Sequence, residues 1–382
     1  MKKKVLSLLL AVVMTFSLAV TANAAEETAQ DLDGDIVILH TNDVHGAISG
    51  YAKVAALKDA YEARGAYVLL MDAGDFIQGD PTVSTSEGAT AVELMNLAGY
   101  DVASMGNHEF DYGYQNLKDL EADADFTIVD ANVLYNGQVA FEDNVVFTAP
   151  DGTKIGVFGL DTPETATKAH PAKIQGVTFL AGDKMFDCAQ DQVDALEAEG
   201  CEYIICLGHL GIDAESTGNR SIDLLEKVEG IDVFIDGHSH TKMECEWVKD
   251  LSGKDVALTQ TGSYFANVGE MTIKADGSIA TRLISSYEGS DSAVADIQNA
   301  WVASVDDMLG EKIAVADTNF YISDPETGKR RIRMAETNLG DFVADGIYSY
   351  FNEVEQLHCD IAIMNGGGIR ADEKAGYWTF KT

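Results

Sequence analysis

The sequence predicts an α/β fold, and three observations point to that class. Between residues 35 and 287, apolar runs of strand type alternate with segments of helical spacing, which is typical of helices that cover sheets. Asp-Gly pairs at 151–152 and 276–277 each separate two apolar runs and therefore predict β-hairpins. Glycine-flanked polar residues follow several runs directly, as they do at the carboxyl edge of an open sheet, where ligands bind.

The chain begins with a segment of secretory type. Lys2, Lys3 and Lys4 precede an apolar run that is followed by Ala22-Asn23-Ala24, a small-residue cleavage site. Residues 1–25 are therefore predicted to be a signal peptide that is removed from the mature protein. An uncleaved anchor helix is the alternative, but an apolar run of about 16 residues is short for a membrane span of about 20. We expect a secreted or extracytoplasmic protein, in a periplasm or at the cell surface, without stable membrane insertion after cleavage.

Residues 26–290 are predicted to form the first domain. Segments with apolar residues at helical spacing alternate with its strands, at 52–63, 89–98, 114–121, 183–199 and 219–228. Because the two hairpins interrupt this alternation, the sheets should be mixed rather than purely parallel.

A linker helix and the start of a second domain are predicted after residue 290. Residues 291–311 have apolar residues at helical spacing with no glycine until Gly310. In 312–382, the pattern predicts a strand over 313–323, a helix over 336–350 with a Thr or Asn cap, and a strand over 360–365 that enters a glycine-rich turn.

Composition narrows the class of partner. A formal net charge of −37 over 382 residues disfavours nucleic-acid polymers and anionic lipid surfaces, because long-range repulsion opposes their approach. Bound divalent metals would supply the local positive charge that an anionic small molecule needs. The five cysteines show no metal-type CxxC spacing, so most are expected to be small buried apolar residues rather than a disulfide framework.

The residues that follow the predicted strands form the ligand inventory of a two-metal hydrolase. Two neighbouring divalent ions need a carboxylate between them, with imidazoles and oxygens around them. The candidate ligands are Asp43, His45, Asp75, Asn107, His209, His238 and His240. Mixed oxygen and nitrogen ligands favour Zn, Mn, Fe or Co over Ca or Mg.

Spacing suggests how some of these ligands are placed. Asp43 and His45 are two residues apart, as are His238 and His240, so strand periodicity predicts that each pair shares a face. Asp75 is the best candidate for the bridging carboxylate, because Gly74 lets the backbone turn tightly beside the metals.

A second group of residues is predicted to act beside the metals. His108 and Asp111 stand three apart, which allows the carboxylate to hold an imidazole that stabilises a phosphoryl oxygen or protonates a leaving group. Two kinds of role are open for Glu109 and Asp72: they could support the metal ligands, or they could be solvated or capping residues. The other histidines, which are expected to be core or surface residues, are His40, His170 and His358.

In these motifs the chain resembles the calcineurin-like metallophosphoesterase superfamily and, within it, the 5′-nucleotidases. ILHTNDVHG, DAGDFIQG, GNHEFDYG, GHLG and GHSHT are similar to that family's five blocks, in its order. The resemblance implies a four-layer αββα sandwich, followed by a linker helix and an incomplete α+β C-terminal domain.

The resemblance also implies roles for residues of the site. One metal site would use Asp43, His45, Asp75 and His240, and the other Asp75, Asn107, His209 and His238. The catalytic dyad would be His108 with Asp111. ETNLGDFVAD and NGGGIR resemble the start of the family's nucleotide-binding domain, which implies substrate contacts from Arg333, Asn365 and Arg370.

The expected activity is hydrolysis of nucleoside 5′-monophosphates to nucleoside and phosphate, in nucleotide scavenging. A 2′,3′-cyclic-nucleotide 2′-phosphodiesterase/3′-nucleotidase or a UDP-sugar hydrolase is the alternative. The family's cyclic-nucleotide branch tends to carry Asn where this chain has Asp111, which favours the 5′-nucleotidase. The chain ends before the aromatic residues with which the family stacks the base, so we expect a fragment. A secreted binding or adhesion module without catalysis is the alternative of another class, and the complete ligand set argues against it.

Overall fold

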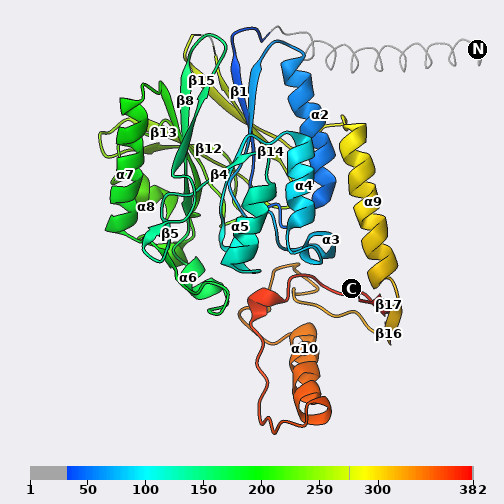
Figure 1. Ribbon diagram of the computed structural model, residues 1–382. Helices are drawn as coiled ribbons and strands as arrows, with labels where there is room; N and C mark the ends of the chain where they lie inside the picture. Colours follow the sequence, from blue (N-terminus) through cyan, green and yellow to red (C-terminus); the bar gives the residue numbers. More distant parts are fainter. Residues whose placement is uncertain (1–31, 275, 381–382) are drawn as a thin grey trace, which may run out of the picture. The chain divides into compact units, whose positions relative to one another are not determined.

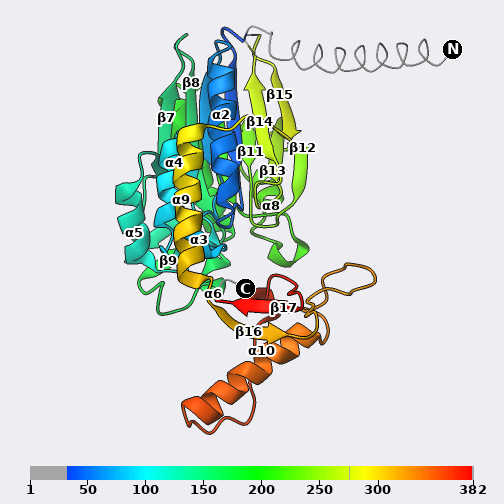
Figure 2. The ribbon, with the colours of Figure 1, turned by 90° about the vertical axis from the view of Figure 1, so that its right-hand side faces the viewer.

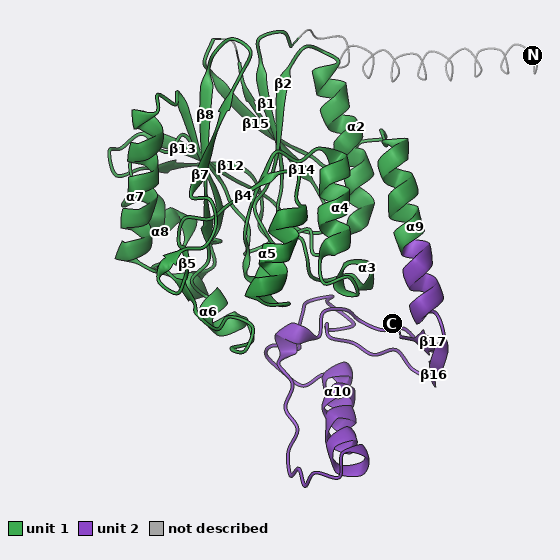
Figure 3. Cartoon of the chain, in the orientation of Figure 1, with its two compact units in different colours: residues 1–301 green, residues 302–382 purple. Residues whose placement is uncertain are grey.

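The computed structural model describes residues 32–274 and 276–380, so the predicted signal peptide lies outside the described part. The chain divides into two compact units, Met1–Trp301 and Val302–Thr382 (Figure 3). Each unit is described separately below.

The first unit is built on two mixed six-stranded sheets. One has the order β15-β14-β1-β2-β3-β4 and consists of β1 (Ile36–Thr41), β2 (Tyr67–Asp72), β3 (Val102–Ser104), β4 (Thr127–Val129), β14 (Val268–Ile273) and β15 (Ile279–Ile284). The other has the order β12-β13-β11-β10-β8-β7 and consists of β7 (Asn144–Thr148), β8 (Lys154–Asp161), β10 (Tyr203–His209), β11 (Val233–Ile235), β12 (Lys242–Lys249) and β13 (Asp255–Thr261). A small third sheet joins β5 (Val133–Tyr135), β6 (Gln138–Val139) and β9 (Val177–Phe179).

Helices cover the outer faces of both sheets. Those beside the first sheet are α2 (Tyr51–Glu62), α3 (Pro81–Ser84), α4 (Ala89–Ala98) and α5 (Tyr114–Asp123), and α2 and α4 stand in front of the strands in Figure 2. Those on the other side are α6 (Thr165–Lys168), α7 (Asp183–Ala198) and α8 (Ser221–Leu225) (Figure 1). Short 3₁₀ turns lie at Ile48–Gly50, Asn107–Phe110 and Ala214–Ser216. The unit is therefore the αββα sandwich that the sequence implied.

Alternation along the strands explains the two buried layers. In β10, Ile205 and Leu207 point between the sheets, where they join Ile36 and Val157 in one apolar cluster. The intervening Cys206 points to the opposite face, into the cluster beneath α7 and α8. A strand that is covered on both faces has no polar side, which is why YIICLG reads as a continuous apolar run.

Both predicted hairpins are present. β7 pairs antiparallel with β8 around Asp151-Gly152, and β14 pairs antiparallel with β15 around Asp276-Gly277. Gly152 and Gly277 have φ of +99° and +81°, which glycine adopts without steric cost. β1 to β4 are parallel to one another, so the sheets are mixed, as predicted.

Most helices that were predicted from periodicity agree closely with the structure, and one was predicted too long. Segment 89–98 coincides with α4, and 52–63 is shifted from α2 by one residue. Segment 219–228 was predicted too long, because α8 ends at Leu225 and the chain continues in turns to Gly230, where φ is +97°.

The second unit begins within α9 (Ser292–Leu309), the long helix after the first unit's last strand. It contains β16 (Lys312–Ala316), α10 (Asn338–Ser349), a π-helical turn (Tyr350–Val354), a 3₁₀ turn (Gly366–Gly368) and β17 (Gly376–Thr379). β16 and β17 pair antiparallel. The Thr337 hydroxyl caps α10 by accepting from Gly340 N.

Two strand predictions in this unit need correction. Segment 313–323 is a strand only as far as Ala316. Segment 360–365 is not a strand: Ile361 and Ile363 are 74% and 86% exposed, and within the described residues this segment pairs with no other strand. A strand is stable only with a pairing partner, and alternating apolar residues do not provide one.

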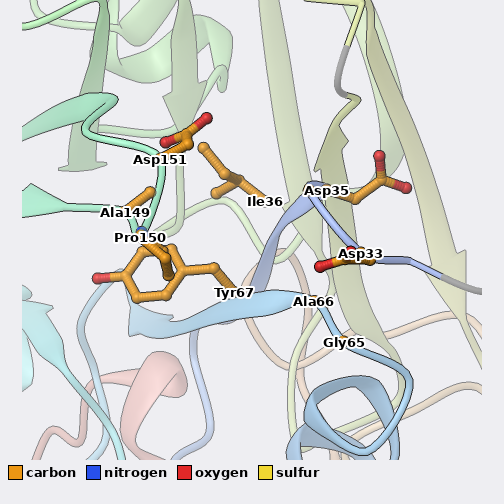
Figure 4. Close-up of a pocket in the computed structure, with 10 residues that line it drawn as sticks. Asp33, Asp35, Ile36, Gly65, Ala66, Tyr67, Ala149, Pro150 and Asp151 are labelled. Atoms are coloured by element: carbon orange, nitrogen blue, oxygen red, sulfur yellow. The ribbon is translucent and has the colours of Figure 1, made fainter.

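A surface pocket of about 380 Å³ lies at the amino ends of β1 and β2 (Figure 4). Tyr67 and Pro150 line it, with Asp33, Asp35 and Asp151 around them. It is at the opposite end of these strands from the predicted ligands, which follow the strands' carboxyl ends.

The expectations for membrane-spanning helices and for the cysteines can be compared with the described residues. Over residues 32–274 and 276–380, no helix is both long and apolar enough to cross a membrane. All five cysteines are free thiols. Only Cys206 is fully buried, while the other four are partly exposed, so the expectation of mostly buried cysteines was too strong.

Candidate metal centre

Loops from five strands converge at one edge of the sandwich. Asp43 and His45 follow β1, Asp75 follows β2, and His209 ends β10. Further members of the predicted set come after β3 and β11: Asn107, His108, His238 and His240. The two sheets face each other, so residues far apart in the sequence meet here.

Five of these residues have a left-handed backbone. Their φ values are +50° at Asp43, +48° at His45, +64° at Asp75, +71° at His238 and +52° at His240. Such a backbone costs a residue with a β-carbon roughly 1–2 kcal/mol. Strain of this kind persists where the surrounding structure enforces it and is concentrated at functional sites.

This geometry corrects one argument made from the sequence. Strand periodicity was expected to place Asp43 with His45, and His238 with His240, on one face. Both pairs instead lie in turns beyond the last strand residue. The left-handed turns direct their side chains, and the pleat of a strand does not.

Three overlapping groups of possible metal ligands occur among the described residues. They are Asp43–His45–His240, His45–Asp75–His108 and Asp43–Asp75–His209, and within each group the ligand atoms lie within 4.8 Å of one another. Asp43 and Asp75 each belong to two groups. Overlap through carboxylates is what two neighbouring cations need to offset their repulsion.

Asp75 lies between two imidazoles. Its Oδ2 is 3.7 Å from His45 Nε2 and 3.2 Å from His209 Nε2. Asp43 Oδ1 is 3.3 Å from His240 Nε2 and 3.8 Å from His209 Nε2. On the far side, His45 Nε2 and His240 Nε2 are 2.9 Å apart.

The His209 side chain is set up as a ligand. Its Nδ1 donates to the Ala73 carbonyl at 2.6 Å, while its buried Nε2 makes no hydrogen bond. Burial lowers the pKa of His209, but Asp75 and Asp43 outweigh burial and raise it well above its ordinary value. A buried imidazole nitrogen that faces two carboxylates without a hydrogen-bond partner fits a divalent cation.

Two glycines leave room for this cluster. A β-carbon at Gly106 would lie 2.5 Å from Asp75 Oδ1 and 2.8 Å from His209 Nε2. One at Gly237 would lie 2.6 Å from His209 Nδ1. The motifs GNHE and GHSH therefore need their glycines because the backbone passes directly beside the ligands.

His108 is connected to the cluster through Asp75 and to solvent-facing Asp111. Its backbone N–H donates to Asp75 Oδ1 at 2.9 Å, and its Nδ1 lies 2.6 Å from Asp111 Oδ2. Both side chains are partly exposed. An imidazole whose Nδ1 hydrogen bonds to a carboxylate presents its Nε2 to the site. His108 is also a member of one of the three groups, beside His45 and Asp75.

His238 and Asn107 lie outside the three groups. The His238 backbone N–H donates to the Asp43 carboxylate, while its Nε2 lies 3.1 Å from Glu164 Oε2 and 2.9 Å from Lys168 Nζ. Asn107 is buried at the start of the 3₁₀ turn after β3. Sequence reasoning missed Glu164 and Lys168, which follow β8 in a segment without glycine-flanked histidines.

Buried Glu109 ties two of the loops together. Its carboxylate accepts from the backbone N–H groups of Gly106, Asp75, Phe76 and Ile77 at 2.7–3.2 Å. Burial, and next the charge of Asp75, raise the pKa of Glu109 to about 7. Of the roles left open for Glu109, the structure shows support of the ligand loops.

Asp236 and Asp72 act similarly on other loops. The Asp236 carboxylate accepts from the backbone N–H groups of Leu210, Gly211 and Gly237. Asp72 accepts from Gly74 N and from the Thr41 hydroxyl. Sequence reasoning missed Asp236, although its place between a strand and Gly237 was a usable signal.

The histidines without a predicted role are located as expected. His40 is buried in β1, and burial lowers its pKa to about 3. His170 and His358 are exposed.

The three predicted substrate residues lie in the second unit. Asn365 Oδ1 accepts from Gly367 N at 3.0 Å and begins the turn Gly366–Gly368. A β-carbon at Gly367 would lie 3.2 Å from Arg333 Nη2, so Arg333 borders this turn. Arg370 follows two residues after the turn, and like Arg333 and Asn365 it is exposed.

Comparison with known families gave two matches. The sequence model described as calcineurin-like phosphoesterase matches residues 36–242. The model described as the 5′-nucleotidase C-terminal domain matches residues 312–382.

Similar proteins carry related descriptions. The chain is 29% identical to the trifunctional nucleotide phosphoesterase protein of Bacillus subtilis and 27% identical to the 5′-nucleotidase of Bos taurus, over 88% of its own length in each case. It spans only 25% and 64% of those two relatives. Among solved structures, a 5′-nucleotidase precursor from Thermus thermophilus superposes with a TM-score of 0.75 at 27% identity, covering 90% of this chain and 72% of that one.

Proposed function

The chain belongs to the calcineurin-like phosphoesterase family, and from this premise we propose that it is a secreted, dinuclear-metal 5′-nucleotidase. The observation that supports this most strongly is the position of Asp75, whose Oδ2 lies 3.7 Å from His45 Nε2 and 3.2 Å from His209 Nε2, beside ligand groups that share Asp43. A single cation needs one such group, whereas two adjacent cations need groups that share carboxylates.

The ligands divide into two sites. Asp43, His45 and His240 would hold one ion and Asn107, His209 and His238 the other, and Asp75 would be a ligand to both. Zn, Mn, Fe or Co suits this mixture of carboxylate, amide and imidazole. When bound, such ions polarise phosphoryl oxygens and lower the pKa of water towards neutrality.

Glu164 sets the orientation of His238 in this arrangement. Glu164 Oε2 lies 3.1 Å and Lys168 Nζ 2.9 Å from His238 Nε2, and we propose the tautomer in which this Nε2–H donates to Glu164. The Nδ1 of His238 then carries the lone pair that a metal requires. Lys168 also pairs with Glu164, at 2.8 Å, and the hydrogen bonds first with His238 and then with Lys168 hold the pKa of this carboxyl well below its ordinary value.

His108 acts on the substrate rather than on a metal. Asp111 Oδ2 lies 2.6 Å from its Nδ1 and holds that hydrogen, so Nε2 is the nitrogen that would donate to a phosphoryl oxygen or to the leaving oxygen. In the second unit, Arg333, Asn365 and Arg370 bind the nucleotide, because a guanidinium recognises a phosphate through paired N–H groups.

The proposed substrate is a nucleoside 5′-monophosphate, and the products are a nucleoside and inorganic phosphate. Similarity to proteins described as 5′-nucleotidases supports this choice. The Bacillus relative is described as a trifunctional nucleotide phosphoesterase, so more than one nucleotide ester is a possible substrate in similar proteins. A 2′,3′-cyclic-nucleotide phosphodiesterase or UDP-sugar hydrolase therefore stays the second candidate. Export through the predicted signal peptide would place the enzyme where nucleotides are scavenged.

Phosphate release from AMP, 3′-AMP, 2′,3′-cyclic AMP and UDP-glucose separates these candidates. We expect AMP to be hydrolysed fastest and the activity to disappear with a chelator. Strong cyclic-nucleotide activity without AMP hydrolysis would replace the first candidate by the second. N-terminal sequencing of the exported protein tests the removal of residues 1–25.

A further inference from the structure

We propose that Tyr264 is a further substrate-contacting residue, whose ring receives the organic leaving group of the phosphate ester. This inference rests on the proposed function, because it assumes that the ester is cleaved at the neighbouring cluster. Tyr264 belongs to none of the five sequence motifs and lies in the loop between β13 and β14.

The ring stands against the cluster. Its centroid is 5.4 Å from that of His45 and 6.3 Å from that of His240. These two histidines are the ones whose Nε2 atoms are 2.9 Å apart. The Tyr264 side chain nevertheless remains 49% exposed, so a large part of the ring is available to a ligand at this side of the site.

The loop holds Tyr264 in a strained conformation. Tyr264 and Phe265 have φ of +55° and +53°, and two consecutive left-handed residues with aromatic side chains cost roughly 2–4 kcal/mol together. A chain that needed only a turn here would be more stable with glycine or asparagine. The strain therefore indicates that the side chain's position matters.

Several contacts fix this position. Tyr264 N donates to the Asp43 carbonyl at 2.9 Å. The Phe265 ring packs against Gly50, where a β-carbon would lie 2.1 Å from it, and against the ring of Tyr51. The loop is thus attached to the same turn that supplies Asp43, and these contacts hold the backbone of Tyr264 beside the cluster.

The chemistry of the ring defines its ligand. Asp43, Asp75 and the imidazoles would hold the cations that attract the phosphoryl group, whereas an exposed aromatic face is suited to a sugar or an aromatic group. A phosphate ester that is bound at the cluster places its organic part beside this face. The ligand class that fits both the cluster and the ring is a phosphate ester of a ribose or of an aryl alcohol.

The test compares Tyr264→Ala with Tyr264→Phe and with Trp247→Ala, an exposed aromatic residue of β12. For each protein, KM and kcat are measured with AMP and p-nitrophenyl phosphate. The inhibition constant of inorganic phosphate and the bound metal are measured on the same samples. Inorganic phosphate occupies the phosphoryl position but has no organic group. Its inhibition constant therefore reports on binding of the phosphoryl group alone, without any contribution from the organic group.

We expect Tyr264→Ala to raise KM for both esters about tenfold, with less than about a twofold change in the phosphate inhibition constant and no loss of metal. Tyr264→Phe and Trp247→Ala should behave as the unchanged protein. A parallel loss of metal or of phosphate inhibition would overturn the proposal, because Tyr264 would then position His45 and His240. An unchanged KM would overturn it as well.

If the unchanged protein releases no phosphate, the proposed function fails. A direct binding measurement then tests whether Tyr264 contacts the organic group of the ligand. Calorimetry with a non-hydrolysable nucleoside phosphonate should then show about tenfold weaker binding to Tyr264→Ala than to the unchanged protein. Equal binding would contradict the contact.

Discussion

Single residues of the cluster serve several neighbours at once, and Asp75 does so most clearly. Its two carboxylate oxygens face His45, His209 and the backbone of His108. Replacing one side chain here therefore affects both proposed metal sites.

Asp75→Asn should remove both metals and reduce activity by more than about a hundredfold, since the loss of an outer-shell partner alone costs about 10–100-fold. Elemental analysis of the purified protein and phosphate release measure the two effects. Asp187→Asn, on the exposed face of α7, is the control. Retention of two metals by Asp75→Asn would show that Asp75 is not the shared ligand.

Buried His40 predicts a pH dependence of stability. Burial lowers its pKa from 6.5 to about 3, so between these values the unfolded chain binds a proton that the folded chain does not. The His40 contribution is complete above pH 6.5 and is lost as pH falls, by about 2–3 kcal/mol between pH 6.5 and 4.5.

Urea unfolding of the chelated protein at pH 7 and 4.5 measures this loss. The free energy of unfolding of His40→Leu should fall less between pH 7 and 4.5, and the difference should equal the His40 contribution given above. That of His170→Gln, at an exposed position, should change as in the unchanged protein. An equally steep decline in His40→Leu would assign the acid sensitivity to other groups.

At the scale of elements, local patterns were predictable and pairings across the chain were not. The Asp-Gly hairpins and α4 depend on neighbours in sequence, and they were located correctly. Segment 360–365 has the pattern of a strand but lacks a partner in the described chain. The pattern alone does not contain that information.

The candidate site shows the same difference between local features, which the sequence predicts, and contacts between distant segments, which it does not. Polar residues at strand ends were identifiable, because the carboxyl edge of a sheet is a general place for ligands. The hydrogen bonds of the supporting carboxylates were not: Glu109 was left open between two roles and Asp236 was missed, since each joins loops that the fold alone brings together. Glu164 was missed for the same reason: its partner His238 is 74 residues away.

The loop connection through Glu109 can be tested directly. Glu109→Gln keeps the volume but replaces an acceptor oxygen with an NH₂ group that faces backbone donors, so metal affinity should fall about 10–100-fold. Competition with a chelating dye measures the affinity. Glu226→Gln, which alters an exposed carboxylate, should bind metal normally, and normal binding by Glu109→Gln would show that the connection is dispensable.

At the scale of the whole molecule, the two units supply different parts of the proposed reaction. The first contains every proposed metal ligand, and the second contains Arg333, Asn365 and Arg370. Cleavage chemistry and nucleotide recognition should therefore be separable by mutation.

Arg370→Ala should raise KM for AMP about 10–100-fold, because a charge-assisted contact with phosphate is removed, and should leave p-nitrophenyl phosphate hydrolysis nearly unchanged. Lys329→Ala, at another exposed cation of this unit, serves as the control. Equal losses on both substrates would argue against a contact that is specific for nucleotides.

The central claim is that the strand-end cluster is a two-metal centre that hydrolyses nucleoside monophosphates. The most direct test is to strip the protein with a chelator, return metal in known amounts, and follow phosphate release from AMP. Activity should return and saturate at two metal ions per chain. Saturation at one ion, or no AMP hydrolysis at any metal content, would contradict it.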